Sequence, residues 1–137
     1  LAKEKLLKVN ELSTFKNFFH QCEIQKKILR NLLINLKSTG KKVYGYGAST
    51  KGNVILQFCN IDKKLIKNIG EVNPYKYNSF TPGTKIKIIS ESKLRKLKPD
   101  YLLVLPWHFK DFILNKEKDY LNKGVKFIFP LPDIEII

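Results

Sequence analysis

The sequence predicts an α/β fold in which an open parallel sheet of about five strands carries flanking helices and follows a long amphipathic helix. Between residues 42 and 129, short apolar runs alternate with helical or turn segments, which is typical of βαβ units. Before them, residues 12–36 repeat apolar side chains at three- and four-residue steps, as an amphipathic helix does. The length of 137 residues suits one domain with a single core.

The long helix is predicted over residues 12–36. Its apolar stripe consists of Leu12, Phe15, Phe19, Cys22, Leu29, Leu33 and Leu36, widened by Phe18, Ile28 and Leu32. We expect Ser13 or Thr14 to cap its start, and Ser38-Thr39-Gly40 to end it.

Strands are expected over residues 42–46, 68–72, 85–89, 100–105 and 126–129. Helical patterns cover residues 51–59, 91–97 and 109–121, and we expect Ser90 to cap the second of these helices and Pro99 to end it. Residues 73–84 hold two prolines and a glycine with little periodicity, so we expect a loop there.

The segment from Val43 to Asn53 reads as a strand, a glycine turn and the first turn of a helix. Unpaired amides at a helix start and the positive end of the helix dipole favour anions, so the segment predicts a phosphate site. Its spacing matches neither common phosphate motif. Gly52 comes two residues too late for a dinucleotide fingerprint, and Lys51 precedes the last glycine instead of following it as in a P-loop. A purely structural turn with an incidental lysine remains the alternative.

Other candidate residues follow later strands, whose carboxyl ends meet the same crevice of an open α/β sheet. Glu71 stands where a Rossmann-like domain places its ribose-binding acid, although a solvated acid paired with a lysine fits the pattern nearly as well. Trp107 offers a face for stacking on a base or sugar, or else it belongs to the core. His108 can cap the next helix, bind a phosphate or carry a proton.

The formal net charge of +14 raises the alternative of a basic nucleic-acid-binding module. The lysines, however, are spread along the whole chain and form no basic cluster interleaved with aromatics, so a nucleic-acid role is disfavoured. The dinucleotide-binding domain of an oxidoreductase is a second alternative, disfavoured by the late third glycine.

Cys22 and Cys59 lie far apart in apolar helical patterns, which indicates buried thiols. No stretch has the length of a membrane span, and we expect a cytoplasmic protein.

A set of short motifs falls in a fixed order along the chain. The set comprises Gly45-Tyr46-Gly47-Ala48 through Lys51-Gly52-Asn53, Asn73-Pro74, Thr81-Pro82-Gly83-Thr84, Pro99-Asp100-Tyr101, Leu105-Pro106-Trp107-His108-Phe109, Gly124 with Lys126-Phe127-Ile128, and Pro130-Leu131-Pro132. In this order the motifs closely resemble the C-terminal domain of the S-adenosylmethionine-dependent sugar C-methyltransferases, which act on nucleoside-diphosphate keto-sugars. The family pattern also has an acidic residue two positions before Asn-Pro, as Glu71 is here, and often Asn where this chain has His108.

The resemblance implies a single Rossmann-like C-terminal domain over residues 11–137, with residues 1–10 as a linker from upstream domains. It further implies that S-adenosylmethionine and the catalytic base belong to a central domain and zinc to an N-terminal one, so we predict no catalytic residue and no metal ligand in this chain. Its expected role is to bind the nucleotide-sugar, with the fragment inactive alone, and His108 is expected to position the ligand. The predicted substrate-binding residues are Gly45, Tyr46, Gly47, Ala48, Ser49, Thr50, Lys51, Gly52, Asn53, Glu71, Asn73, Trp107 and His108.

Overall fold

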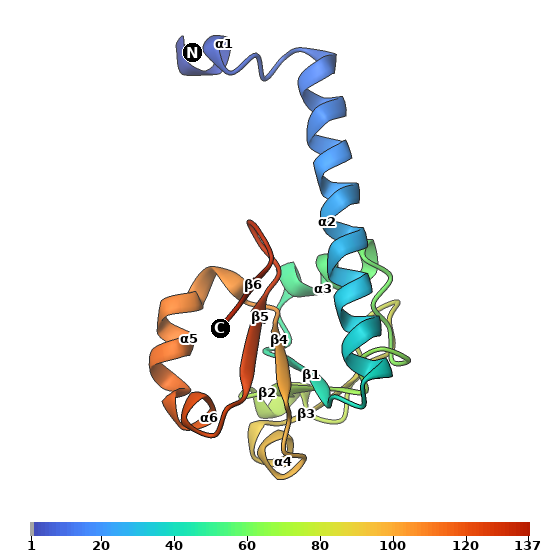
Figure 1. The fold of residues 1–137 in the computed structure, drawn as a ribbon, viewed down its shortest axis with the longest axis vertical. Helices are drawn as coiled ribbons and strands as arrows, with labels where there is room; N and C mark the ends of the chain where they lie inside the picture. Colours follow the sequence, from blue (N-terminus) through green and yellow to red (C-terminus); the bar gives the residue numbers. More distant parts are fainter. Residues whose placement is uncertain (1) are drawn as a thin grey trace.

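The computed structural model describes residues 2–137 and has the predicted α/β architecture (Figure 1). Its helices are α1 (Ala2–Leu6), α2 (Leu12–Ser38), α3 (Thr50–Phe58), α4 (Glu91–Lys96), α5 (Lys110–Lys116) and α6 (Lys118–Asn122), with 3₁₀ turns η1 (Pro74–Lys76) and η2 (Trp107–Phe109). Its strands are β1 (Val43–Tyr46), β2 (Asn68–Glu71), β3 (Lys87–Ser90), β4 (Tyr101–Val104), β5 (Lys126–Phe129) and β6 (Glu135–Ile136).

The strand order β3-β2-β1-β4-β5-β6 is that of a Rossmann-like doubly wound sheet. All neighbouring pairs are parallel except β5 and β6, which are antiparallel. The chain runs from β1 outward to β3 and then returns to the other side of β1 with β4. The order therefore reverses between β1 and β4, which is where such sheets bind ligands, beyond the carboxyl ends of the strands.

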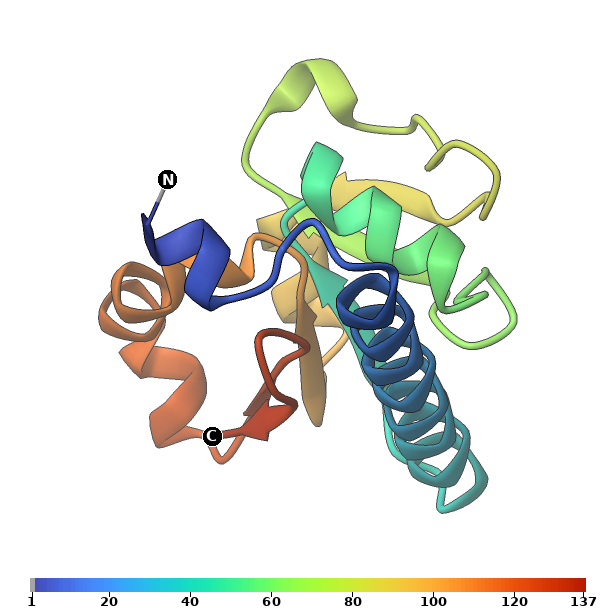
Figure 2. The same ribbon diagram turned by 90° about the horizontal axis from the view of Figure 1, so that it is seen from above.

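Helices cover both faces of the sheet. Successive side chains along each strand point to opposite faces, so they pack into two separate cores. Leu103 and Leu105 face the core under α2 and α3, whereas Leu102 and Val104 face the core under α4, α5 and α6. Seen from above, α2 and α3 stand on one side of the sheet and α5 and α6 on the other (Figure 2). Strands buried on both faces read as continuous apolar runs, which is why the sequence located them.

The ends of α2 differ in how well the sequence predicted them. Neither Ser13 nor Thr14 caps the start: Glu11 is the N-cap residue and makes no side-chain capping bond, while the Ser13 hydroxyl donates to the Glu11 carboxylate. The prediction of a Ser13 or Thr14 cap was therefore wrong. The predicted stop is confirmed, since Gly40 follows the helix with a φ of 74°, in the left-handed region that glycine favours.

Three features go beyond the predicted elements. Strand β6 adds a sixth strand at the edge of the sheet. The helix predicted over residues 109–121 is divided into η2, α5 and α6, with a break at Glu117. Residues 2–6 of the predicted linker form the short helix α1, Leu1 lies outside the described residues, and the linker role itself stays a prediction.

Candidate functional site

Two closely packed glycines, one in the loop between β1 and α3 and one in the first turn of α3, set the path of this segment. A Cβ on Gly47 would lie 2.8 Å from two ring carbons of Pro106, and the φ of Gly47 is 76°. A Cβ on Gly52 would lie 2.3 Å from the Cβ of Leu105. Gly52 thus lets α3 approach the end of β4, which is the packing role of the third glycine in a dinucleotide fingerprint, although it comes two residues later.

The start of α3 leaves few amides for an anion. The Ser49 hydroxyl caps the helix by accepting from the Gly52 amide at 3.0 Å, and the Ser49 carbonyl accepts from the Asn53 amide. Within residues 2–137, only the Thr50 and Lys51 amides of this first turn have no hydrogen-bond partner. The Lys51 side chain is exposed beside them. A phosphate at the helix start would therefore contact these two residues.

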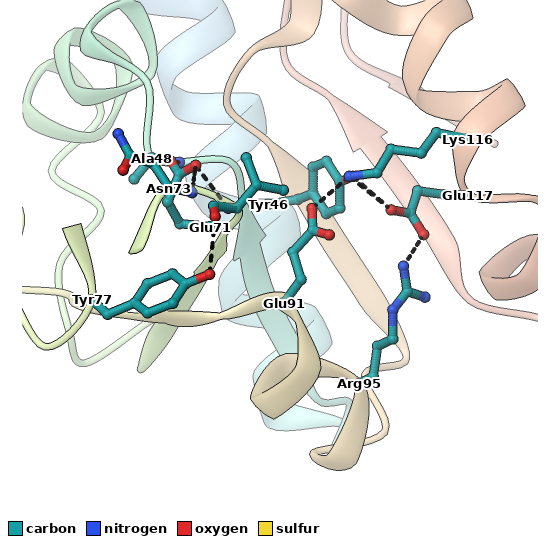
Figure 3. Close-up of polar contacts among 10 residues, drawn as sticks. Tyr46, Ala48, Glu71, Asn73, Tyr77, Glu91, Arg95, Lys116 and Glu117 are labelled. Carbon is teal, nitrogen blue, oxygen red and sulfur yellow. Dashed lines mark hydrogen bonds and ion pairs between the residues drawn. The ribbon is translucent and has the colours of Figure 1, made fainter. Parts of the chain in front are cut away.

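Glu71, at the end of β2, is buried and holds the loop together (Figure 3). One carboxylate oxygen accepts from the Ala48 amide at 2.9 Å and lies 3.4 Å from the Lys76 ammonium. The other accepts from the amides of Val72 and Asn73 at 2.8 and 3.0 Å. A carboxylate bound by three backbone donors and a cation has little capacity left for a sugar hydroxyl, so its geometry is that of a loop support.

A cleft of about 220 Å³ lies where the strand order reverses, between the β1 loop and the η2–α5 segment. Tyr46, Lys76 and Lys116 line it together with the carboxylates of Glu71 and Glu91, and the exposed rings of Phe109 and Phe112 line its η2–α5 side. Pockets for whole ligands usually exceed about 300 Å³, so this cleft suits part of a nucleotide-sugar. Two cations beside exposed aromatic faces suit a phosphate joined to a flat ring or a sugar.

A polar network closes the floor of this cleft (Figure 3). The Tyr46 hydroxyl donates to the fully buried Glu117 carboxylate at 2.7 Å, and Arg95 donates to the other oxygen of Glu117 at 2.6 Å. The Lys116 ammonium lies 3.1 Å from the Tyr46 hydroxyl and 2.8 Å from Glu91. Burial, reinforced by Glu117, raises the pKa of Tyr46 far above its ordinary value, so its hydroxyl keeps its proton.

A second cleft of about 200 Å³ opens on the α3 side of the same loop and shares Ala48, Ser49 and Lys76 with the first. Thr50 and Asn53 line it. The predicted loop residues are therefore divided between two neighbouring clefts, with Tyr46 and Gly47 in the first and Thr50 and Asn53 in the second. Lys51 lines neither cleft.

The two predicted residues after β4 lie apart from these clefts. Trp107 packs against both cores and lines a large groove beside α2. The ring of His108 is exposed, 5.5 Å from the Trp107 ring and 4.2 Å from the Phe109 ring between centroids. Asn73 caps η1 by accepting from the Tyr75 amide. The structure thus brings the loop and Glu71 together and places Trp107 elsewhere.

Comparison with known proteins decides the family. Residues 1–132 match the C-methyltransferase C-terminal domain family. The chain belongs to this family. It is also 32% identical over 137 residues to the C-methyltransferase NovU of Streptomyces niveus, a match that covers 100% of this chain and 33% of that protein. The chain therefore spans about a third of the length of the curated relative it matches.

Sequence reasoning missed several residues of this C-methyltransferase domain that line the first cleft, namely Lys76, Glu91, Phe109, Phe112 and Lys116. They lie on short helices and turns where a charge or an exposed ring looks like an ordinary solvated face. For Lys116 there was one usable signal in the sequence. Tyr46 lies in a buried strand, and a buried tyrosine needs a hydrogen-bond partner for its hydroxyl. Among residues 2–137 no group of three metal-binding side chains lies together, and no helix has the length and apolarity to cross a membrane.

Proposed function

We propose that this domain binds the nucleoside-diphosphate keto-sugar substrate of an S-adenosylmethionine-dependent C-methyltransferase, in the cleft between the β1 loop and α5. The observation that carries the proposal is the pairing of two ammonium groups, Lys76 and Lys116, with the exposed rings of Phe109 and Phe112 at the point where strand order reverses. Family membership supports the methyltransferase setting, since the curated relative is a C-methyltransferase.

The proposed division of labour assigns only positioning to this chain. Methyl transfer to a carbon beside a carbonyl needs a base, an enolate stabiliser and a placed methyl donor. The strand-end carboxylate that would hold the ribose of such a donor, Glu71, already accepts three backbone amides. The residues here do not fit the donor, and we assign the donor and the base to the upstream part of the enzyme. On this proposal the 137-residue chain alone transfers no methyl group.

Within the cleft, each group has a distinct role in the proposal. Lys116 and Lys76, which pair with Glu91 and Glu71 in this structure, exchange these carboxylates for the diphosphate, and the Phe109 and Phe112 rings support the base or sugar. The Tyr46 hydroxyl stays protonated and fixes the position of Lys116 from the floor of the cleft. The predicted helix-start contact through Thr50 and Lys51 remains a competing position for the diphosphate.

Calorimetric titration of the 137-residue chain with nucleoside diphosphates and their sugars tests the proposal. Phe112→Ala should weaken binding by about 1–3 kcal/mol, the range for losing a stacked ring. Phe80→Ala is the matched control, because Phe80 is exposed and lines neither cleft. Comparing Lys116→Ala with Lys51→Ala then locates the diphosphate: each should cost about 1–3 kcal/mol only if its own site is used. Equal affinity for Phe112→Ala and wild type would remove the cleft as the binding site.

A further inference from the structure

The apolar stripe of α2 has two halves with opposite exposure. In the C-terminal half, Leu29 and Leu33 are 2% and 1% exposed, because they pack on the sheet. In the N-terminal half, Phe15 and Phe19 continue the same stripe but are 59% and 60% exposed. Figure 1 shows why: the first half of α2 projects beyond the sheet. A helix gains most of its stability from packing such a stripe. We therefore expect the bare, exposed half of the stripe to pack against another protein surface.

The bare half borders a groove of about 830 Å³. The groove runs between α2, α3 and the turn that joins β5 to β6. Phe18, Phe19, Val54 and Phe58 are exposed in its walls, and Cys22 is half-buried there. We call this surface, together with Phe15, the α2–α3 face. Its exposed aromatic side chains are typical of the core of a protein–protein interface.

We infer that the α2–α3 face is the docking surface for the upstream, methyl-donor part of the same methyltransferase chain. The inference rests on the proposed division of labour. The family is a C-terminal domain, and the chain matches 33% of its curated relative, so in such an enzyme the remaining part joins at the N-terminal end. In this structure that end leads through α1 and residues 7–11 into the bare half of α2. Covalent attachment there raises the effective concentration of the upstream part at the α2–α3 face.

A second copy of the chain is the less suitable occupant. The formal net charge is +14, so two copies repel each other. A second copy necessarily has the same positive charge, whereas a different part of the enzyme need not be positively charged. The aromatic face and the position of the N-terminal end therefore point to the upstream part.

Maleimide labelling of Cys22, followed by peptide mass spectrometry, tests the inference in the full-length methyltransferase and in the 137-residue chain. Cys22 should label at least about tenfold more slowly in the full-length protein, as expected for a site that reacts only when an interface opens. Phe15→Ser combined with Phe19→Ser should restore rapid labelling. Phe80→Ser, an exposed aromatic outside the face, should leave Cys22 protected.

Two results would overturn the inference. One is equal labelling of Cys22 in the full-length protein and the isolated chain. The other is an isolated chain that sediments as a dimer dissolved by the double substitution, which would assign the face to a second copy. Nucleotide-sugar titration of the double variant keeps this test apart from the proposed function, because neither phenylalanine lines a cleft at the β1 loop. Unchanged ligand affinity with lost Cys22 protection is the expected combination.

Discussion

Glu117→Ala should be among the most destabilising single changes at a charged residue of this domain. Glu117 is fully buried, and its two oxygens accept from the Tyr46 hydroxyl and from Arg95. Alanine removes the acceptor for both donors. Lys116 cannot replace it, because an ammonium group donates and does not accept.

The magnitude follows from the exposure of the two donors. Tyr46 is buried, so leaving its hydroxyl without an acceptor costs about 1–3 kcal/mol. The Arg95 side chain is 39% exposed, so water replaces most of its lost partner and the cost is about 1 kcal/mol or less. The total is about 1–4 kcal/mol, and with a urea m-value of about 2 kcal/mol/M the unfolding midpoint falls by about 0.5–2 M.

Urea unfolding followed by circular dichroism measures this loss, with two comparison variants. Glu117→Gln keeps a carbonyl oxygen for Tyr46 but replaces the acceptor of the partly exposed Arg95 with an amide donor, so it should cost about 1 kcal/mol. Asp119→Ala removes an exposed acid of α6 that pairs with Lys123 at the end of this helix, and should cost no more than about 0.5 kcal/mol. If Glu117→Ala were as mild as Asp119→Ala, the network would carry no stability and the reasoning would fail.

Two further predictions concern the strand and loop beside this network. Gly47→Ala should cost more than Gly124→Ala: both glycines have φ near 80°, at 76° and 79°, but a Cβ on Gly124 meets open space, whereas one on Gly47 meets Pro106. The strained φ costs each variant about 1 kcal/mol, and overpacking adds about 1–3 kcal/mol at Gly47, so equal unfolding free energies would contradict the packing account. Tyr46 contributes stability below its ordinary pKa of 10.0 that is lost as pH rises above that value, since the folded state keeps a proton which the unfolded state releases. In an alkaline titration, the tyrosinate absorbance missing from Tyr46→Phe should appear in wild type only with unfolding, and its appearance in the folded protein would refute the assignment.

The buried strands and the long helix were predictable because their signals are local. The run Leu102–Leu105 is apolar at every position, as a strand covered on both faces must be. Strand β6 was not, because Glu135 and Ile136 are too few residues for any periodicity and depend on pairing with β5. The break at Glu117 was also hidden, since a charged residue in a helical pattern normally faces water, whereas this one turns inward to a tyrosine 71 positions away.

The candidate site was predictable only in part, for the same reason. Glycines, a capping serine and a strand-end acid are recognised by their spacing along the chain, and these residues do gather around the β1 loop. Lys116 and Phe112 lie on a helix whose pattern is unremarkable, and only the return of the chain past β1 through β4 brings them to the loop. Trp107 follows β4 as predicted, but it lines the groove beside α2 and neither of the two clefts at the β1 loop.

The β1 loop illustrates why its resemblance to a phosphate motif and its actual contacts must be read separately. The loop amide of Ala48, which such a motif would offer to a ligand, is bound to the protein's own Glu71 carboxylate. An anionic ligand placed against that amide would meet this negative charge at close range, which costs several kcal/mol in a partly buried site. The cations Lys76 and Lys116 line the first cleft, where they pair with the carboxylates of Glu71 and Glu91. On the proposed function, a diphosphate in the first cleft has to replace these carboxylates as the partner of the two ammonium groups, and the Lys116→Ala and Lys51→Ala titrations test that position against the helix start.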